Sequence, residues 1–160
     1  MGADIYCFIE TSYDGEYWSS FGSLSPAQDY DLFGLLAGVR GSRQPMIPPR
    51  GLPLDLAAEA AVATFFYITE TGEGEGETTR KKAAAWVTAG VSQWRDEEQA
   101  WVTHYGLRGH SWMTPTEWRR CIELPSTFGG SRDPSYFAVA AAMEEFERRG
   151  LKVRVVFWFD

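Results

Sequence analysis

Histidine and cysteine are scarce in this 160-residue chain, and their scarcity excludes several kinds of catalytic site. There are two histidines, His104 and His110, and two cysteines, Cys7 and Cys121. Cys7 falls in a strand pattern and Cys121 on a helix face, so we expect two buried thiols rather than a disulfide. The chain has no GxSxG segment, and its GVRGSR segment lacks the lysine of a phosphate-binding P-loop. The sequence therefore offers no familiar motif for nucleophilic catalysis or phosphate binding.

Spacings typical of metal ligands are also missing. A protein metal centre needs three or four converging ligands. The two histidines could meet Asp4, Glu10 or Asp31 only through the fold, because no HExxH or similar spacing is present. We therefore expect neither a metal nor another cofactor.

Long apolar runs and a basic surface are absent as well. No run approaches the roughly 20 apolar residues that span a bilayer, and no charged-then-apolar leader opens the chain, so we expect a cytoplasmic protein without a membrane partner. The net charge of -7 argues against direct binding to a nucleic-acid backbone, which would need a broad basic face. It leaves open an acidic protein that mimics nucleic acid and blocks a basic protein.

Strand and helix signals alternate over a length that suits a single domain, residues 1–160. Residues 4–10 and 16–21 flank an Asp-Gly turn and predict a β-hairpin. Residues 152–159 predict a strand that is apolar on both faces, which is typical of a central strand. We expect further elements between them: helices at 32–40, 55–63, 115–124 and 134–149, and a strand at 64–68. This pattern indicates an α+β fold, with helices packed on a mixed or antiparallel sheet that contains both terminal strands.

Capping signals define the ends of several predicted helices. Asp29 and Asp31 suit the start of the first helix, and capping explains them better than acid–base chemistry. Gly41 is the expected left-handed stop of that helix, and Asp55 is a candidate cap of the next one. The TPTE segment at 114–117 predicts a capping box with proline in the first turn.

The segment from 70 to 102 has an unusual composition. Residues 70–79, ETGEGEGETT, have no apolar side chain to bury and predict a flexible acidic loop. Residues 80–102 resume a helical pattern that carries Trp86, Trp94 and Trp101, three of the seven tryptophans.

An arginine-rich loop follows the first predicted helix. Arg40, Arg43 and Arg50 lie within eleven residues that contain no acid. Each guanidinium could bind phosphate or carboxylate as a planar fork. Arg40 could instead complement the dipole of its own helix, and Arg50 could hold the loop through carbonyl groups. Because three cations gather in an acidic protein, we favour an anion site here.

His110, Ser111 and Trp112 form a second candidate cluster. They lie just before the predicted capping box and are expected in a loop, a position that often carries binding residues. His110 could act in function or could merely fix the loop through a backbone carbonyl. One histidine alone does not make a catalytic triad.

Five segments together resemble a family of small bacteriophage proteins. They are GADIYCFIE at 2–10, YDLFGLLAGVRG at 30–41, PPRGLPLDL at 48–56, GHSWMTPTEW at 109–118 and VRVVFWFD at 153–160. The family's corresponding segments are a GCDIH-type start, the helix itself, a PRGLP loop, an HSHSW segment and a C-terminal strand. The match therefore touches both ends and the middle of the chain. The segment 64–105 is longer than is usual in the family.

Two histidines of the family pattern are replaced in this chain, by Tyr6 at the start and by Arg108 in the HSHSW segment. If they bind a metal in relatives, this chain has lost two ligands. The matching residues that persist are a carboxylate, two cations, a histidine, a hydroxyl and an aromatic ring, namely Asp4, Arg40, Arg50, His110, Ser111 and Trp112. With Arg43 and Tyr30, they form a set better suited to recognising a nucleotide than to hydrolysing one.

The resemblance implies a phage protein that acts in the cytoplasm of the infected host cell. We expect a small-ligand-binding protein that sequesters a nucleotide-type immune signal of the host without cleaving it. A first alternative is a hydrolase or phosphodiesterase that uses His110, with Asp4 as its only candidate partner. A second is an acidic interaction protein that blocks a host defence complex through residues 70–101. The two-sided apolar strand and the many tryptophans are compatible with a homo-oligomer.

Overall fold

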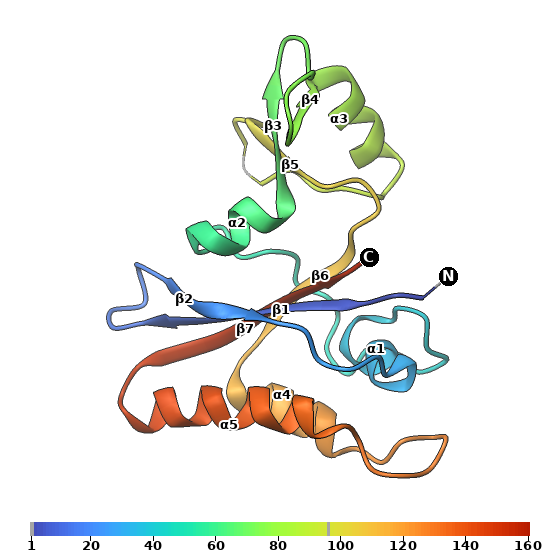
Figure 1. The fold of residues 1–160 in the computed structure, drawn as a ribbon, viewed down its shortest axis with the longest axis vertical. Helices are drawn as coiled ribbons and strands as arrows, with labels where there is room; N and C mark the ends of the chain where they lie inside the picture. Colours follow the sequence, from blue (N-terminus) through green and yellow to red (C-terminus); the bar gives the residue numbers. More distant parts are fainter. Residues whose placement is uncertain (1, 96) are drawn as a thin grey trace.

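A four-stranded antiparallel sheet with strand order β2-β1-β7-β6 forms the centre of the fold. The computed structural model describes residues 2–95 and 97–160. The strands are β1 (Ile5–Ser12), β2 (Ser19–Leu24), β6 (Arg108–Met113) and β7 (Lys152–Phe159). The two terminal strands β1 and β7 are neighbours along their whole length, from the pair Ile5↔Phe159 to the pair Ser12↔Lys152. Figure 1 shows them side by side in the middle of the molecule.

Helices cover one face of this sheet because the odd-numbered side chains of β1 and β7 on that face are apolar. The helices are α1 (Tyr30–Ala37), α4 (Pro115–Glu123) and α5 (Pro134–Arg148). The buried residues from the strands are Ile5, Cys7, Ile9, Met113, Val153, Val155, Phe157 and Phe159. This face holds the larger of the two hydrophobic cores.

A smaller unit covers the opposite face. The helix α2 (Ala58–Thr64) packs there over Phe8, Val156 and Trp158 and continues directly into a second sheet. That sheet has the order β4-β3-β5, with β3 (Phe65–Thr69), β4 (Glu77–Thr79) and β5 (Trp101–Thr103), and α3 (Arg80–Thr88) packs beside it. We call residues 65–103 the small lobe, which forms the upper end of the molecule in Figure 1. Because both faces of β7 are covered within the chain, its apolar character does not require a second copy.

The fold confirms the predicted α+β class, the single domain and the terminal hairpin. Two helix starts are also as expected. Thr114 and Glu117 form the reciprocal capping box of α4, and Asp133 caps α5 by accepting a bond from the Ser135 amide. Asp29 likewise caps α1, through the amide of Leu32.

The predicted helix boundaries are wrong at two places. The left-handed stop of α1 is Gly38, with φ of 70°, and not Gly41. Gly41 is needed for another reason, since a Cβ atom there would collide with the backbone oxygen of Tyr30. The cap of α2 is Ala57, whereas Asp55 lies further from the helix and binds an arginine of the sheet.

The segment 70–102 also differs from its prediction. Glu77–Thr79 form β4, which pairs with β3 in parallel, so only residues 70–76 of the acidic segment lie outside regular structure. The helical pattern that starts at Arg80 ends at Thr88, and Trp101 begins a strand. The pattern failed because these tryptophans pack on neighbouring rings: Trp101 on Phe65 and Tyr67, and Trp86 on Phe66.

A buried ion cluster joins α2 to the main sheet. Arg154 on β7 donates 2.8 Å bonds to the carboxylates of Glu10 and Asp55, and its guanidinium lies 3.8 Å from the centroid of the Trp18 ring. Glu10 also accepts a 2.9 Å bond from the amide of Ala57, the first residue before α2. The cluster therefore fixes the base of the small lobe on the sheet.

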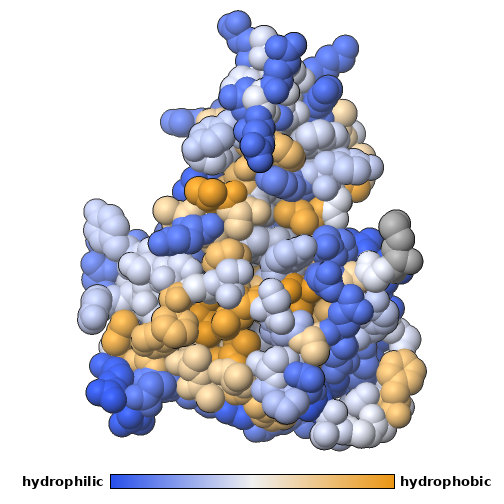
Figure 2. All heavy atoms as spheres, in the orientation of Figure 1, coloured by the Kyte–Doolittle hydropathy of each residue, from blue (hydrophilic) through white to orange (hydrophobic). Residues whose placement is uncertain are grey.

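The surface is unevenly apolar. Figure 2 shows hydrophobic side chains gathered between β2 and α5, where Phe21, Leu24, Pro26 and Val139 line a groove of about 220 Å³, whereas the tip of the small lobe is hydrophilic. Among the described residues, no helix has both the length and the apolar character needed to cross a membrane.

Candidate functional site

The segment His110–Trp112 lies on strand β6 rather than in the predicted loop. β6 pairs with β7 through Ser111↔Phe157, and the register shifts between Arg108 and Ser111. Gly109, at the shift, has φ of 65°, which favours glycine. The ring of His110 stacks on Trp158, so this side chain lies on the face of the sheet that carries the small lobe.

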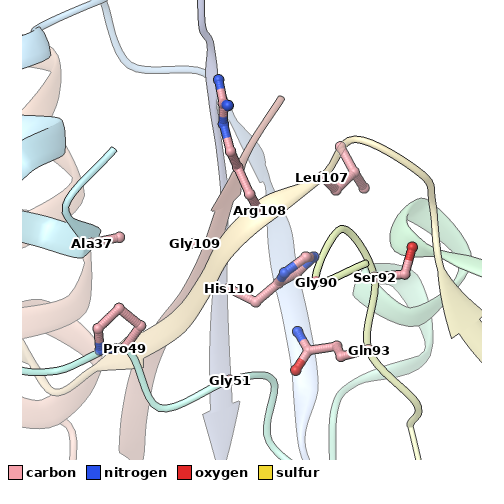
Figure 3. Close-up of a pocket in the computed structure, with 10 residues that line it drawn as sticks. All are labelled: Ala37, Pro49, Gly51, Gly90, Ser92, Gln93, Leu107, Arg108, Gly109 and His110. Carbon is pink, nitrogen blue, oxygen red and sulfur yellow. The ribbon is translucent and has the colours of Figure 1, made fainter. Parts of the chain in front are cut away.

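A cleft of about 420 Å³ opens between β6, the arginine-rich loop and the small lobe. Three segments supply most of its lining: Arg108 and His110 come from β6, Pro49 and Gly51 from the loop, and Ser92 and Gln93 from the small lobe. Figure 3 shows the His110 ring extending from β6 toward the loop that carries Gly90 and Ser92. No aspartate or glutamate is among the described residues that line the cleft. The cleft is therefore suited to an uncharged or anionic ligand.

His110 is the most unusual residue of this cleft. It is only 7% exposed, and its Nε2 atom has no hydrogen-bond partner among the described residues. The ring stacks on Trp158, with 6.1 Å between the ring centroids. Burial lowers the pKa of His110 to about 4, so the imidazole is neutral at pH 7. A neutral imidazole offers one acceptor and one donor nitrogen.

The hydroxyl of Ser92 is a second buried polar group without a partner among the described residues. Buried polar atoms in proteins are nearly always hydrogen-bonded, so each exception asks for an explanation. His110 comes from β6 and Ser92 from the connection between α3 and β5, and both residues line one cleft. A bound ligand that bonds to both would satisfy them together.

Arg50, Ser111 and Trp112 do come together, but they bond to one another and to α4. The Arg50 amide donates to the Ser111 hydroxyl at 3.0 Å, and its guanidinium lies 4.2 Å from the centroid of the Trp112 ring. The same guanidinium forms a two-bond ion pair with Glu117, at 2.6 and 2.8 Å, and the bond to Arg50 helps to lower the pKa of Glu117. Arg50 thus ties the loop to the capping box of α4.

The other two arginines of the loop differ from each other. Arg43 donates to Asp31 and to the backbone oxygen of Pro125, so it too holds the loop in place. Arg40 is exposed, has φ of 58°, and has no bonding partner for its side chain among the described residues. It follows Val39, whose side chain lies against Gly109 of β6. Of the three cations, Arg40 is the one available to a ligand.

Asp4 and Tyr30 lie apart from His110. Asp4 accepts a 2.6 Å bond from the Gln28 amide and lines a different cavity of about 400 Å³. The Tyr30 hydroxyl accepts a bond from the amide of Ala3. Ile5 and Arg108 pair with Phe159 from opposite sides, so β7 separates the strand after Asp4 from the strand of His110. Asp4 and His110 therefore do not form an acid–base pair across one cleft.

Sequence reasoning missed Ser92, Gln93 and Arg108 as lining residues. Ser92 and Gln93 fall in a stretch that had the pattern of a helix, and only the tertiary fold brings them to β6. Arg108 donates a 3.3 Å bond to the backbone oxygen of Asp160. Its position in the family-like segment was the only signal that could have marked it.

The described lining of the cleft contains no aspartate, glutamate, cysteine or second histidine beside His110. No cluster of three or more histidine, cysteine, aspartate or glutamate side chains that could hold a metal occurs within residues 2–95 and 97–160.

Comparisons of the chain with models of known protein families, with curated proteins and with solved structures gave no match.

Proposed function

We propose that the protein is a small-ligand-binding protein that captures a nucleotide-type molecule in the cleft beside β6 without cleaving it. One observation carries the proposal: His110 Nε2 and Ser92 Oγ are both buried without a hydrogen-bond partner among the described residues, and both residues line the same cleft. Leaving two such groups unsatisfied is unfavourable by about 1–3 kcal/mol each. A ligand with a donor and an acceptor on one edge would recover this free energy.

A heteroaromatic base fits these groups. Its edge presents donors and acceptors that neutral histidine, serine and the Gln93 amide can match, while Leu107 and Pro49 supply apolar walls. The negative charge of a nucleotide would lie near Arg108 at the cleft and the exposed Arg40 beyond it. A volume of about 420 Å³ is adequate for a compound of this size.

The biological role rests on the sequence resemblance to small phage proteins. A phage protein that binds a nucleotide without turnover would act by lowering the free concentration of a signal. We therefore propose sequestration of a nucleotide-type immune signal of the host, in the cytoplasm of the infected cell. The described lining of the cleft places no carboxylate or second histidine beside His110, and this supports binding rather than cleavage.

The test is a capture assay on purified protein. The protein is incubated with a panel of cyclic and ADP-ribose-derived nucleotides, filtered, and then heated to release what it holds. Capture is expected to be lost in Ser92→Ala and in His110→Asn, and to persist in the matched variants His104→Asn and Gln28→Ala. His104 directly follows the small lobe and stacks on Phe66 of that lobe, and Gln28 lines the separate cavity near Asp4.

The outcomes separate the possible functions. Intact nucleotide in the heated fraction supports sequestration. A converted product would replace the proposal with a hydrolase that uses His110. Capture by Ser92→Ala and by His110→Asn that equals capture by wild type would show that the cleft is the wrong site.

A further inference from the structure

Three sulfur atoms meet in the main core, on the face of the sheet opposite to the cleft. They belong to Cys121 on α4, Met113 at the end of β6, and Met46 in the arginine-rich loop. The Cys121 Sγ atom lies 3.5 Å from Met46 Sδ and 4.0 Å from Met113 Sδ. Cys121 and Met113 have no exposed surface, whereas Met46 is partly buried. Residues far apart in the sequence thus place two methionine sulfurs within 4.0 Å of the Cys121 sulfur.

The spacing of these atoms fits a three-coordinate metal. With metal–sulfur bonds of about 2.3 Å, three sulfurs arranged trigonally around an ion are about 4.0 Å apart. The separations of Cys121 Sγ from the two methionine sulfurs, 3.5 and 4.0 Å, are close to this value. Thiolate and thioether ligands select soft ions, copper(I) above all.

The charge of the site restricts the ion further. Cys121 is the only one of the three side chains that can ionise, so a monovalent cation on its thiolate gives a neutral unit. A divalent ion would leave a net positive charge among the apolar residues of the core, which is unfavourable without a counter-ion. Zinc and other divalent ions are therefore disfavoured.

We propose that Cys121, Met113 and Met46 form a binding site for copper(I). Binding exchanges the thiol proton for the ion: the S–H bond of Cys121 breaks, a sulfur–copper bond forms, and the proton leaves to solvent. No electron is transferred. The ion enters past Met46, the partly buried ligand.

Two physical consequences follow. Burial raises the pKa of Cys121 to about 11, so copper(I) competes with a firmly held proton and its affinity increases with pH. The ion also cross-links the loop of Met46 to α4 and β6, so it stabilises the fold by mass action. Packing of sulfur in a core is the ordinary alternative, since methionine often fills irregular gaps.

The test is an anaerobic titration of the full chain with copper(I) against a chromophoric copper(I) chelator. The expected result is one ion per chain, an ultraviolet thiolate-to-copper absorption, release of one proton, and a higher melting temperature. Met46→Leu and Met113→Leu conserve volume and remove one sulfur each, so each is expected to bind at least tenfold more weakly. Cys121→Ala is expected to lose the absorption, while the matched variant Cys7→Ala, which removes the other buried thiol, retains it.

Met46→Leu is the decisive variant because Met46 is only partly buried and its replacement leaves the core intact. Copper(I) binding of wild-type strength in both methionine variants would overturn the three-sulfur site. So would zinc binding as tight as copper(I) binding, or an absorption that depends on Cys7. In each case the cluster would be sulfur packing only.

Discussion

Replacing Arg154 with methionine is expected to destabilise the protein strongly. The Arg154 side chain is 7% exposed and its partner Glu10 is fully buried, so solvent screens this pair little. Removing one member of a buried pair leaves the other charge uncompensated, which lowers the free energy of unfolding by about 3–5 kcal/mol. In a domain of this size 1 kcal/mol shifts the melting temperature by about 2–4 °C, so Arg154→Met is expected to lower it by about 6–20 °C.

The pH dependence of this loss has a defined sign. In the native protein burial raises the pKa of Glu10, against the lowering effect of Arg154. A carboxyl group with a raised folded pKa favours the folded state below its unfolded pKa, and this contribution is lost as pH rises through the folded pKa. Without Arg154 the pKa of Glu10 rises further. The stability difference between variant and wild type is therefore expected to be largest near neutral pH and to shrink toward about pH 4.

The assay is thermal unfolding of four proteins at several pH values: wild type, Arg154→Met, Glu10→Gln and the double variant. Because Glu10→Gln removes the stranded charge, the double variant is expected to recover at least about half of the loss. Asp55→Asn is the matched control. Its side chain is 47% exposed, so a loss of about 1 kcal/mol or less is expected. A double variant no more stable than Arg154→Met, or a loss independent of pH, would refute the reasoning.

Three further predictions concern the cleft and its supports. Ligand capture by wild type is expected to be constant from about pH 8 to about pH 5.5 and to fall as the pH approaches the His110 pKa of about 4. A loss of capture with its midpoint near pH 6.5 would contradict a buried neutral imidazole. Arg50→Ala is expected to lower the free energy of unfolding by about 1–2 kcal/mol, because it loses a partly exposed ion pair and a stacking contact. Arg50→Lys is expected to lower it by less. Chemical denaturation measures both variants, and equal losses would argue against the two-bond geometry. Gly41→Ala is expected to destabilise the protein by more than about 2 kcal/mol, because its Cβ atom would meet the backbone of Tyr30. The control Gly106→Ala, with φ of 88° and open space around it, carries only about 1–2 kcal/mol of backbone strain. Equal melting temperatures of the two variants would contradict the packing at Gly41.

Local signals were sufficient for the main architecture. A short stretch of sequence is enough to predict the hairpin, the two capped helices of the second half and the central C-terminal strand. Thr114 and Glu117 bond within one turn of helix, and β7 is buried on both faces from Val153 to Phe159. Where the pattern and the tertiary packing agree, as in these segments, sequence alone predicts the element.

Tertiary contacts decided the segments that were wrong. The chain around His110 reads as a loop because Gly109 and the register shift interrupt its alternation, yet pairing with β7 makes it a strand. Trp101 has a helical neighbourhood in sequence but pairs with Tyr67. Ser92 reaches the cleft only because the small lobe folds over β6, so no local pattern could have marked it.

The arginine-rich loop shows what residue type alone leaves out. Arg50 and Arg43 have no acid nearby in the sequence, but the fold brings Glu117 to one and Asp31 to the other. Both were predicted ligand-binding residues and both have intramolecular partners. Arg40 remains the cation of this loop that a ligand can use.

The most direct measurement is the capture assay with wild type and Ser92→Ala side by side. The account predicts that wild type depletes at least one nucleotide of the panel and releases it intact on heating, and that Ser92→Ala depletes it at least tenfold less while melting at the same temperature. Capture by Ser92→Ala equal to that of wild type, or no capture by wild type of any nucleotide, would contradict a nucleotide-binding cleft beside β6.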